Sequence, residues 1–206
     1  VALLVIFQPE IRRALAEIGK RPVFSVSAEK KTVINAIVEA TSQLSENRIG
    51  ALIAIERKIG TGSVQETGVK LDAKVVPELL ASVFYPHTPL HDGGVIINGN
   101  QIVAAGCIFP LSQNLELHKR VGTRHRAAVG MSEETDAVVV VVSEETGVIS
   151  VCYRGRLSQG LDEERLRRFL SALLLKEDMP DGPWKRAQEQ VNLSPESTPG
   201  HGSGTE

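Results

Sequence analysis

The stretch AVVVVVSEETGVISVCY, residues 137–153, decides the fold of this chain. It opens with five consecutive valines at positions 138–142. Valine is stiff at its first side-chain torsion and packs well on a pleated surface, so the run disfavours a helix and predicts a central strand. Glu145, Thr146 and Gly147 supply turn residues before a second apolar run. The stretch is therefore predicted to form a β-hairpin.

Two segments upstream of this hairpin also have the character of strands. Residues 94–109, GVIINGNQIVAAGCIF, contain a second predicted hairpin around Asn98 and Gly99. An Asn-Gly pair tolerates positive φ angles and favours a tight two-residue turn. Residues 49–57, IGALIAIER, form a short continuous apolar run, as expected of a strand that is covered on both faces.

Four segments show helical periodicity: residues 9–20, 28–50, 76–84 and 162–179. The last begins with acids in its first turn, which suits the helix dipole. The apolar stripes of the second and fourth helices are formed by Val33, Ile37, Val38, Thr41 and Leu44, and by Leu166, Phe169, Leu170 and Leu173. Strands inside and helices outside predict an α/β fold, a central mixed β-sheet flanked by helices, over residues 21–180.

Composition limits the possible functions. The chain of 206 residues has 23 Lys and Arg against 25 Asp and Glu, a net charge of -2. Binding to nucleic acid needs a broad basic face, which a near-neutral chain does not favour. The two cysteines, Cys107 and Cys152, have no CxxC spacing, so neither a disulfide framework nor a structural zinc site is indicated. A reducing compartment fits this cysteine usage best.

The N-terminal run VALLVIF, residues 1–7, is far shorter than the roughly 18 to 20 residues of a membrane span. Arg12 and Arg13 follow it, a pattern expected where the last membrane helix of a longer protein leaves on the cytoplasmic side. A short buried segment of a soluble domain is the alternative. We expect residues 1–8 to be the remnant of a membrane helix and residues 9–20 to be a linker helix.

The C-terminal end has a different composition. Residues 192–206, NLSPESTPGHGSGTE, are rich in Ser, Pro and Gly and have almost no large apolar side chains. Such a segment cannot bury enough apolar surface to offset the entropy lost on ordering. We expect residues 181–206 to form a disordered tail.

A histidine and an aspartate precede the upstream hairpin. PLHDGG, residues 89–94, places His91 and Asp92 directly before its first strand. An imidazole and a carboxylate can share a divalent cation there, and Gly93 and Gly94 allow a ligand to approach the backbone. Ordinary Asp-Gly turn chemistry is the alternative. Metal-dependent phosphohydrolases also use a His-Asp pair, but they need further ligands on a helical scaffold, which this β-rich context does not offer.

Acidic residues follow the valine strand. In SEETG, residues 143–147, Ser143, Glu144 and Glu145 lie at the carboxyl end of a strand, where α/β sheets commonly bind ligands. Alternation along a strand sends the two glutamates to opposite sides, which predicts that at most one of them faces a site. Solvated turn acids are the alternative.

A local cluster of positive charge lies in GTRHRAAVG, residues 122–130. Thr123 is predicted to cap a helix from Arg124 to about Met131, with free N–H groups and a positive dipole end at its start. Guanidiniums from Arg124 and Arg126 beside such an end favour polyphosphate binding over pairing with surface acids. No segment reads G-x-x-x-x-G-K-[ST], so the site is not a P-loop.

A metal-binding pair, a cationic helix start and an acidic strand end together imply nucleotide chemistry, without distinguishing a kinase from a cyclase. The motifs LHDGGVI, GTRHRAAVG and VSEETG, in this order and spacing, resemble the diadenylate cyclase domain. That family condenses two ATP molecules into cyclic di-AMP. The resemblance covers roughly residues 1–155, and FQPEIRRAL, RIGALIAIER and ETGVKLDAKV resemble its membrane-anchored branch.

The chain departs from the family's usual pattern at two positions. Gly94 stands where the family usually has alanine, and the loss of one methyl group is expected to loosen the loop without removing a functional group. Ile108 stands where an aromatic residue often stacks on adenine, so weaker stacking on the base is expected.

The resemblance implies a role for each motif. Asp92 would lie beside the ribose and assist deprotonation of the attacking 3′-hydroxyl, and His91 and Glu145 would hold a divalent ion, Mn²⁺ or Mg²⁺. Cys107 would help to line the adenine pocket, where backbone groups around Phe109 would contact the base edge. The residues implied as catalytic are Asp92, Gly93, Arg124, His125 and Arg126. Those implied to bind ATP are Asp92, Gly93, Gly94, Ile108, Phe109, Pro110, Leu111, Gly122, Thr123, Arg124, His125, Arg126, Ser143 and Glu144.

The implied reaction needs two copies of the domain. Each ATP supplies both the nucleophile and the electrophile, so two domains must meet face to face about a two-fold axis. The resemblance also implies a full-length protein at the cytoplasmic face of the cell membrane, with regulatory protein partners, and a soluble fragment in the present chain.

Two alternatives from other classes stay open. One is a nucleotide-binding sensor or scaffold without turnover, although such a protein would not need the hydroxyl-activating Asp92. The other is a nucleic-acid module, but it would need an extended basic face and stacking aromatics, which are only 4% of the chain. We therefore expect no nucleic-acid partner.

Overall fold

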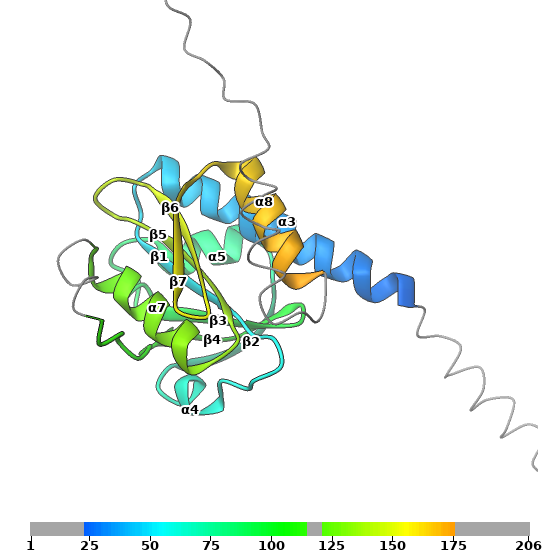
Figure 1. Cartoon of the computed structure of the whole chain (residues 1–206), viewed down its shortest axis with the longest axis horizontal. Coiled ribbons are helices and arrows are strands. Elements are labelled where there is room, and N and C mark those ends of the chain that lie inside the picture. Colours follow the sequence, from blue (N-terminus) through cyan, green and yellow to red (C-terminus); the bar gives the residue numbers. More distant parts are fainter. Residues whose placement is uncertain (1–22, 115–120, 176–206) are drawn as a thin grey trace, which may run out of the picture.

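The computed structural model describes residues 23–114 and 121–175 (Figure 1). The predicted helix at 9–20, the N-terminal remnant at 1–8 and the tail at 181–206 lie outside the described residues. The helices are α3 (Val23–Glu46), α4 (Gly62–Gln65), α5 (Pro77–Phe84), α7 (Thr123–Glu134) and α8 (Glu163–Leu174). The strands are β1 (Ala51–Ile55), β2 (Val69–Lys74), β3 (Gly94–Asn98), β4 (Gln101–Cys107), β5 (Val138–Val142), β6 (Ile149–Tyr153) and β7 (Arg156–Leu161).

The strands form one seven-stranded sheet in the order β2-β4-β3-β1-β5-β6-β7. β1 and β3 are parallel, and the other neighbouring pairs are antiparallel. The sheet is therefore mixed and has helices on both faces, as the sequence predicts. Among the described helices, none combines the length and the apolar character needed to cross a membrane.

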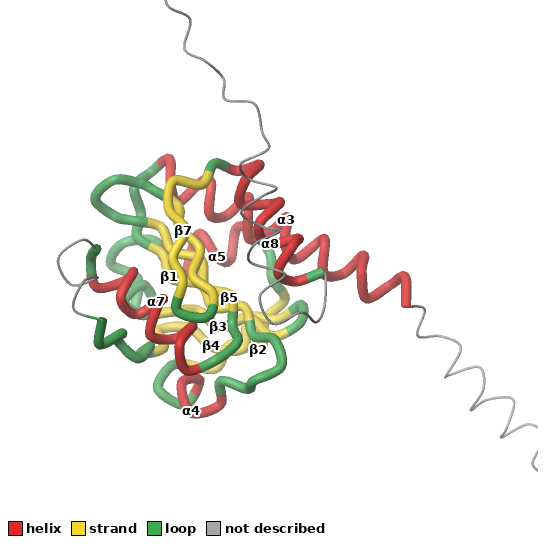
Figure 2. The backbone as a smooth tube through the Cα atoms, viewed as in Figure 1, coloured by secondary structure: helices red, strands yellow, loops and turns green. Residues whose placement is uncertain are grey.

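The sheet separates two apolar cores. α3, α5 and α8 cover one face and α7 covers the other (Figures 1 and 2). Alternation along β5 divides its side chains between them: Val138, Val140 and Val142 enter the first core, and Val139 and Val141 enter the second. All five side chains are fully buried, which confirms the predicted interior strand. Each contributes on the order of 1.5–3 kcal/mol through removal of apolar surface from water.

The helical stripes are also confirmed. The predicted stripe residues of α3 and α8 are all buried, including Thr41. α3 begins at Val23, earlier than predicted, and ends at Glu46. At the start of α8, the Asp162 carboxylate accepts a 2.7 Å hydrogen bond from the amide of Arg165, which caps the helix.

Both hairpins form, but their turns differ from the prediction. Asn98 pairs with Gln101, so the two-residue loop is Gly99 and Asn100 rather than Asn98 and Gly99. Only the first loop position has a positive φ, 59° at Gly99. β5 and β6 are joined by a longer connection, residues 143–148. The amide of its first residue donates a hydrogen bond to the carbonyl of its last, which closes the connection.

The edge strands β2 and β7 and the short helix α4 were not predicted. β2 is largely exposed and is interrupted between Lys70 and Ala73, where Asp72 has a φ of 46°. β7 is also polar along most of its length. An edge strand has only one neighbour, and polar residues and bulges protect it from pairing with other chains, so the apolar pattern that marks interior strands is absent.

Gly130 allows α7 to pack directly on the backbone of residues 110–112. A Cβ at Gly130 would lie 2.6 Å from the amide nitrogen of Ser112 and would also meet the carbonyl oxygen of Pro110. Because backbone atoms cannot yield easily, Gly130→Ala should lower the free energy of unfolding by about 1–3 kcal/mol. Gly62→Ala is the matched control, since nothing lies within 4 Å of a Cβ there. Urea unfolding compares the two, and equal midpoints would contradict this packing argument.

Candidate nucleotide site

The three sequence motifs meet at one edge of the sheet because of how the strands pair. Val95 of β3 lies opposite Ile53 in the parallel pair, and Val142 of β5 lies opposite Ala51 in the antiparallel pair. The residues before β3, before β1 and after β5 therefore share an edge, with neighbouring strands about 4.8 Å apart. Cys107 pairs with the first residue of β3, so the segment after β4 reaches the same edge.

α7 begins at this edge, one residue earlier than predicted. Gly122 is the N-cap, with extended backbone, and its carbonyl accepts the amide of Arg126 at 3.2 Å. Thr123 is the first helical residue and does not cap the helix through its side chain. Because the first N–H groups of a helix have no partner within the helix, this end can bind an anion through its backbone.

An open pocket of about 600 Å³ lies between the start of α7 and the β5–β6 connection. Its volume is within the range of small-molecule sites. Both Glu144 and Glu145 line it, so the prediction that at most one would face a site was wrong. They lie in a turn, where strand alternation does not apply. The described lining residues are Val121, Gly122, Thr123, Arg124, His125, Val142, Ser143, Glu144, Glu145, Thr146, Val148, Gln159 and Gly160.

Arg124 is held at the sheet edge by two neighbours. Its guanidinium forms an ion pair with Glu144 and packs over Gly50, where a Cβ would lie 2.5 Å from Nη1. The side chains of Arg124 and Glu144 are 26% and 61% exposed. Arg124 therefore does pair with an acid, which was the alternative to phosphate binding. That acid, Glu144, lines the same pocket. An exposed ion pair is weak, so an incoming phosphate can replace the carboxylate.

His125 is packed beneath the start of α7. It is 7% exposed, and its Nε2 lies 3.2 Å from the hydroxyl oxygen of Ser150. Burial removes solvation from the charged imidazolium and lowers the pKa of His125. The ring is therefore neutral near pH 7 and supports the helix start from below.

Arg126 lies apart from the lining of this pocket. Its Nε is buried, without a hydrogen-bond partner among the described residues. Its carbonyl accepts the amide of Ser112 at 3.1 Å, and the Ser112 hydroxyl donates to Glu133 at 3.0 Å. Through its backbone, Arg126 ties α7 to the segment after β4.

His91 and Asp92 lie at the same edge but not in the lining of the 600 Å³ pocket. Asp92 is exposed, and His91 Nδ1 lies 2.6 Å from the carbonyl oxygen of Thr88. That contact requires a proton on Nδ1, which leaves Nε2 as the ring atom with a free lone pair. Gly93 has a φ of 126°, and a Cβ there would lie 2.6 Å from the backbone of Gly106.

Gly94 does not leave a loose loop, contrary to the expectation from its missing methyl group. The ring of Phe109 fills the space, and a Cβ at Gly94 would lie 2.6 Å from its Cε1. Phe109 is 5% exposed, whereas Ile108 is 72% exposed and Leu111 40%. The glycine therefore anchors Phe109 while its neighbours stay accessible.

Three residues that shape this site were not predicted: Gly50, Thr67 and Glu133. The amide of Ile108 donates to Thr67 Oγ1 at 2.9 Å, which fixes the start of the segment after β4. These contacts join positions far apart in the chain, so no local motif indicates them. Cys107, at the end of β4, is buried, and desolvation raises the pKa of its thiol to about 11, which makes it unreactive.

The fold and the geometry of this edge define a nucleotide-binding class of domain. The family model described as DAC, DisA bacterial checkpoint controller nucleotide-binding, matches residues 38–157, and the chain belongs to this family. The chain is 50% identical over 178 residues to the cyclic di-AMP synthase CdaA of Bacillus subtilis, covering 84% of this chain and 65% of that protein. It is 45% identical over 175 residues to the diadenylate cyclase of Listeria monocytogenes, covering 82% and 64% respectively.

Two solved structures superpose on this chain. DacA from Staphylococcus aureus superposes with a TM-score of 0.70 at 42% identity, covering 72% of this chain and 99% of that one. A hypothetical membrane spanning protein from Bacillus cereus superposes with a TM-score of 0.61 at 36% identity, covering 77% and 80%. The present chain spans slightly under two thirds of the length of the B. subtilis and L. monocytogenes relatives.

Gly50→Ala should weaken anion binding without unfolding the domain. The added Cβ would displace the Arg124 guanidinium, the mobile end of a long side chain, so the fold is spared. Losing one charge-assisted contact should lower affinity for inorganic triphosphate about 10-fold or more. Gly60→Ala is the control, because the nearest atom to a Cβ there is Glu56 Oε1 at 3.7 Å. Calorimetric titration measures both variants; unchanged triphosphate affinity in Gly50→Ala would contradict the role given to Arg124.

His125 should make stability depend on pH. The unfolded chain takes up a proton on this residue below about pH 6.5, whereas burial in the folded chain lowers the pKa and resists protonation. The free energy of unfolding should therefore fall as pH decreases below about 6.5, by at most about 1.4 kcal/mol per pH unit from this group. His125→Gln should show a shallower decrease in urea unfolding, while His87→Gln, at an exposed position, should not. Parallel pH profiles for wild type and His125→Gln would rule this out.

Proposed function

We propose that the chain is a diadenylate cyclase that converts two ATP molecules into cyclic di-AMP and two pyrophosphates. The observation that carries the proposal is the meeting of an acid-bearing loop, a cationic helix start and an acidic strand end at one sheet edge. The names of the relatives, cyclic di-AMP synthase and diadenylate cyclase, support it. In each of two steps a 3′-oxygen forms a bond to an α-phosphorus, the bond from that phosphorus to pyrophosphate breaks, and the hydroxyl proton is taken up.

The triphosphate would bind at the start of α7. Backbone N–H groups near Gly122 and Thr123, together with the guanidinium of Arg124, form the positive side of the pocket. The Glu144 carboxylate has to leave Arg124 when phosphate arrives, and Ser143 offers a hydroxyl beside it. Catalysis in such a site is mostly positioning and neutralisation of charge that develops on the phosphate oxygens.

Asp92 would be the base that accepts the proton of the 3′-hydroxyl. It is exposed at the sheet edge, and only the strand β1 lies between its loop and the phosphate pocket. One nucleotide could therefore place its phosphates in the pocket and its ribose near Asp92. Gly93 places this loop against the backbone of Gly106, and that close approach fixes the position of the aspartate. Arg126, which does not line the phosphate pocket, would act through the segment that it binds by its backbone carbonyl.

The adenine would lie on the segment after β4. Ile108 and Leu111 are exposed there, Phe109 is anchored on Gly94, and Pro110 lies against α7. The Thr67 hydroxyl holds the first amide of the segment. The aliphatic Ile108 provides apolar contact in place of aromatic stacking.

A divalent ion, Mn²⁺ or Mg²⁺, would be held by His91 and Glu145 together with oxygen atoms of the substrate. No group of three or more His, Cys, Asp and Glu residues among the described residues can hold a metal, so the protein would supply only part of the coordination. Mg²⁺ is commonly bound in this way, through one or two protein ligands plus phosphates. The hydrogen bond from His91 Nδ1 to Thr88 suits this role because it leaves the lone pair of Nε2 available to a metal. When bound, such an ion lowers the pKa of the hydroxyl and neutralises phosphate charge.

Two copies would be needed for turnover. One copy presents a single helix start for phosphate and a single Asp92, whereas the cyclic product needs two bonds between two nucleotides. A homodimer with the two edges face to face about a two-fold axis supplies both. Anchoring of a longer protein at the cytoplasmic face of the membrane, with regulatory partners, belongs to the same proposal, and the name of the B. cereus neighbour supports the anchoring.

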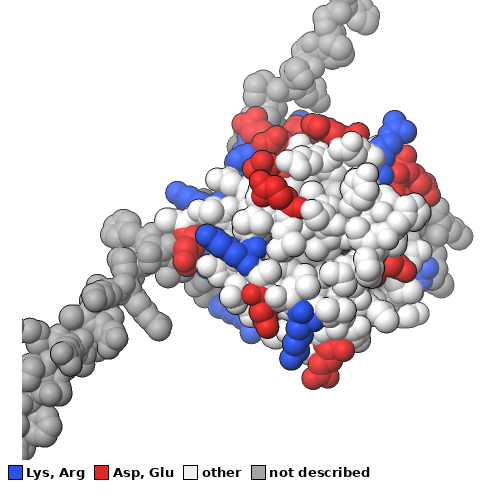
Figure 3. Space-filling view, turned by 180° about the vertical axis from the view of Figure 1, so that it is seen from behind, with Lys and Arg blue, Asp and Glu red and all other residues white. Residues whose placement is uncertain are grey.

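Two other functions are less well supported. A sensor without turnover would not need the exposed acid in front of β3. A nucleic-acid module would need a continuous basic face, but on the side shown in Figure 3 basic and acidic side chains are interspersed around an uncharged centre.

The direct test is incubation of the chain with ATP and Mn²⁺ or Mg²⁺, with products identified by chromatography and mass detection. Asp92→Asn should lower the rate of cyclic di-AMP formation about 100-fold or more and still bind ATP, because only the proton acceptor is lost. Asp72→Asn is the matched control, an exposed acid on the edge strand β2.

The same assay separates the alternatives. ATP binding without product at high protein concentration would favour the sensor. Specific activity should fall on dilution below the dimer dissociation constant, and a concentration-independent value would refute the dimer requirement.

A further inference from the structure

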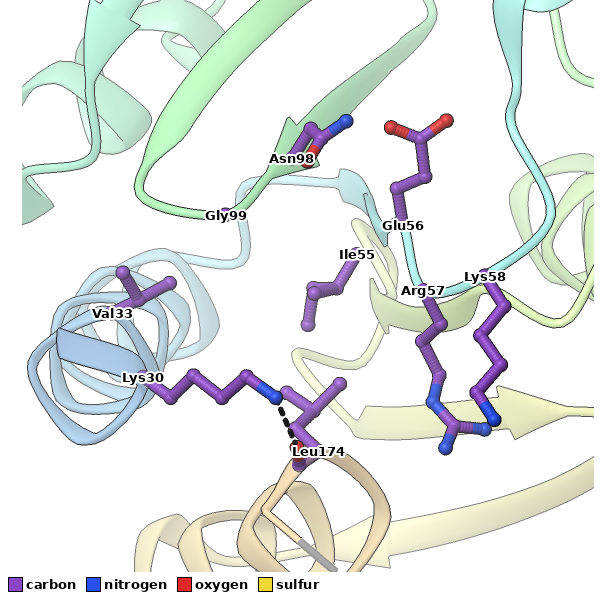
Figure 4. Close-up of a pocket in the computed structure, with 9 residues that line it drawn as sticks. All are labelled: Lys30, Val33, Ile55, Glu56, Arg57, Lys58, Asn98, Gly99 and Leu174. Atoms are coloured by element: carbon purple, nitrogen blue, oxygen red, sulfur yellow. Dashed lines mark hydrogen bonds between the residues drawn. The ribbon is translucent and has the colours of Figure 1, made fainter. Parts of the chain in front are cut away.

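A second cavity lies at the opposite edge of the sheet. It has a volume of about 240 Å³ and is formed where β1 and β3 end, beside α3 and the last turn of α8 (Figure 4). The described residues that line it are Lys30, Val33, Ile55, Glu56, Arg57, Lys58, Asn98, Gly99 and Leu174. None of them belongs to the motifs of the candidate nucleotide site.

Cationic side chains outnumber acids among the described residues that line this cavity. Lys30, Arg57 and Lys58 contribute three cationic side chains, and Glu56 is the one acid among the described lining residues. Figure 4 shows Glu56 pointing away from Arg57 and Lys58, whose charged ends lie on the same side. Glu56 Oε1 accepts the amide of Thr61 at 2.6 Å and the Thr61 hydroxyl at 3.2 Å, whereas its buried Oε2 has no partner among the described residues.

Arg57 is fixed before any ligand arrives. Its Nη1 donates to the hydroxyl of Tyr153 at 2.6 Å, and its guanidinium lies 5.4 Å from the centre of the same ring. Tyr153 is 2% exposed, so the support is rigid. Among the described residues, no carboxylate lies within ion-pair distance of Arg57. A guanidinium oriented in this way keeps donors for a planar or tetrahedral anion at little entropic cost.

The rest of the cavity adds a second cation and an apolar floor. The Lys30 side chain extends from α3 towards α8, where its ammonium group donates to the carbonyl oxygen of Leu174 at 3.4 Å (Figure 4). Val33 and Ile55 are buried at 7% and 5% exposure. A ligand here therefore meets positive charge on one side and carbon on the other.

We propose that this cavity binds a small soluble anion that carries a phosphate group. Its volume is below the range of about 300–1,000 Å³ for drug-sized ligands, so it suits a phosphate with a short carbon portion rather than a whole dinucleotide. A phosphate group is also present in lipid headgroups, but the buried floor formed by Val33 and Ile55 favours a molecule that enters the cavity. The inference does not depend on the proposed cyclase activity.

Titration of the ¹⁵N-labelled chain with glycerol 3-phosphate tests the proposal. The amides of Ile55 and Gly99 report on this cavity, and those of Gly122 and Thr123 report on the nucleotide site. We expect saturable shifts at the first pair. Arg57→Gln should weaken this binding about 10-fold or more, because one charge-assisted contact is lost.

The matched control is Arg154→Gln. Arg154 lies 5.3 Å from the centre of the same Tyr153 ring but is not among the lining residues. The affinity of the Arg154→Gln variant for glycerol 3-phosphate should therefore stay within about twofold of wild type. If both substitutions weakened glycerol 3-phosphate binding equally, the loss would come from altered packing on Tyr153, and the proposed site would be wrong. Shifts confined to Gly122 and Thr123 would also overturn it. Shifts at Ile55 and Gly99 that require vesicles containing phosphatidylglycerol, and do not occur with glycerol 3-phosphate, would assign the cavity to a lipid headgroup instead.

Discussion

The pairing of β1 with its two neighbours is the constraint on which the rest of the structure depends. β1 runs parallel to β3 and antiparallel to β5, with Ala51 opposite Val142. Because β1 is parallel to β3, both strands begin at the same edge, and because β5 is antiparallel to β1, β5 ends there. The loop before β3 and the loop after β5 therefore lie at the same edge. The valine run of β5 places side chains in both cores and so keeps this strand inside the sheet beside β1. Placement of the polar motifs thus follows from apolar pairing in the middle of the sheet.

Two glycines at this edge leave space that side chains from other elements fill. Gly50 leaves room for the Arg124 guanidinium, and Gly94 leaves room for the ring of Phe109. In both cases a glycine on a strand end receives a side chain from a distant element. Such contacts hold a charged group and an aromatic group close to the backbone. At Gly94 the missing methyl group therefore leaves the space that the ring of Phe109 occupies.

Residue patterns predicted the interior of the fold better than its margins. The valine run, the stripes of α3 and α8 and the mixed sheet were recognisable because apolar periodicity reports burial directly. β2 and β7 lack that signal because they are edge strands. The motifs located the site, but pairs such as Thr67 with Ile108 join positions 41 residues apart and depend on tertiary packing. Likewise, Thr123 was expected to cap α7, whereas the cap is Gly122, because helix limits depend on backbone geometry that several residue types can adopt.

The segment between β1 and β2 physically connects the two ends of the sheet. It leaves β1 beside the cationic cavity, where Glu56 holds Thr61, and it reaches the other edge at Thr67, whose hydroxyl holds the amide of Ile108. Between these points Asp136 accepts the amides of Lys58 and Ile59. The connection is therefore hydrogen-bonded to the body of the domain near both of its ends. The cationic cavity and the segment on which we place the adenine thus border opposite ends of the same connection.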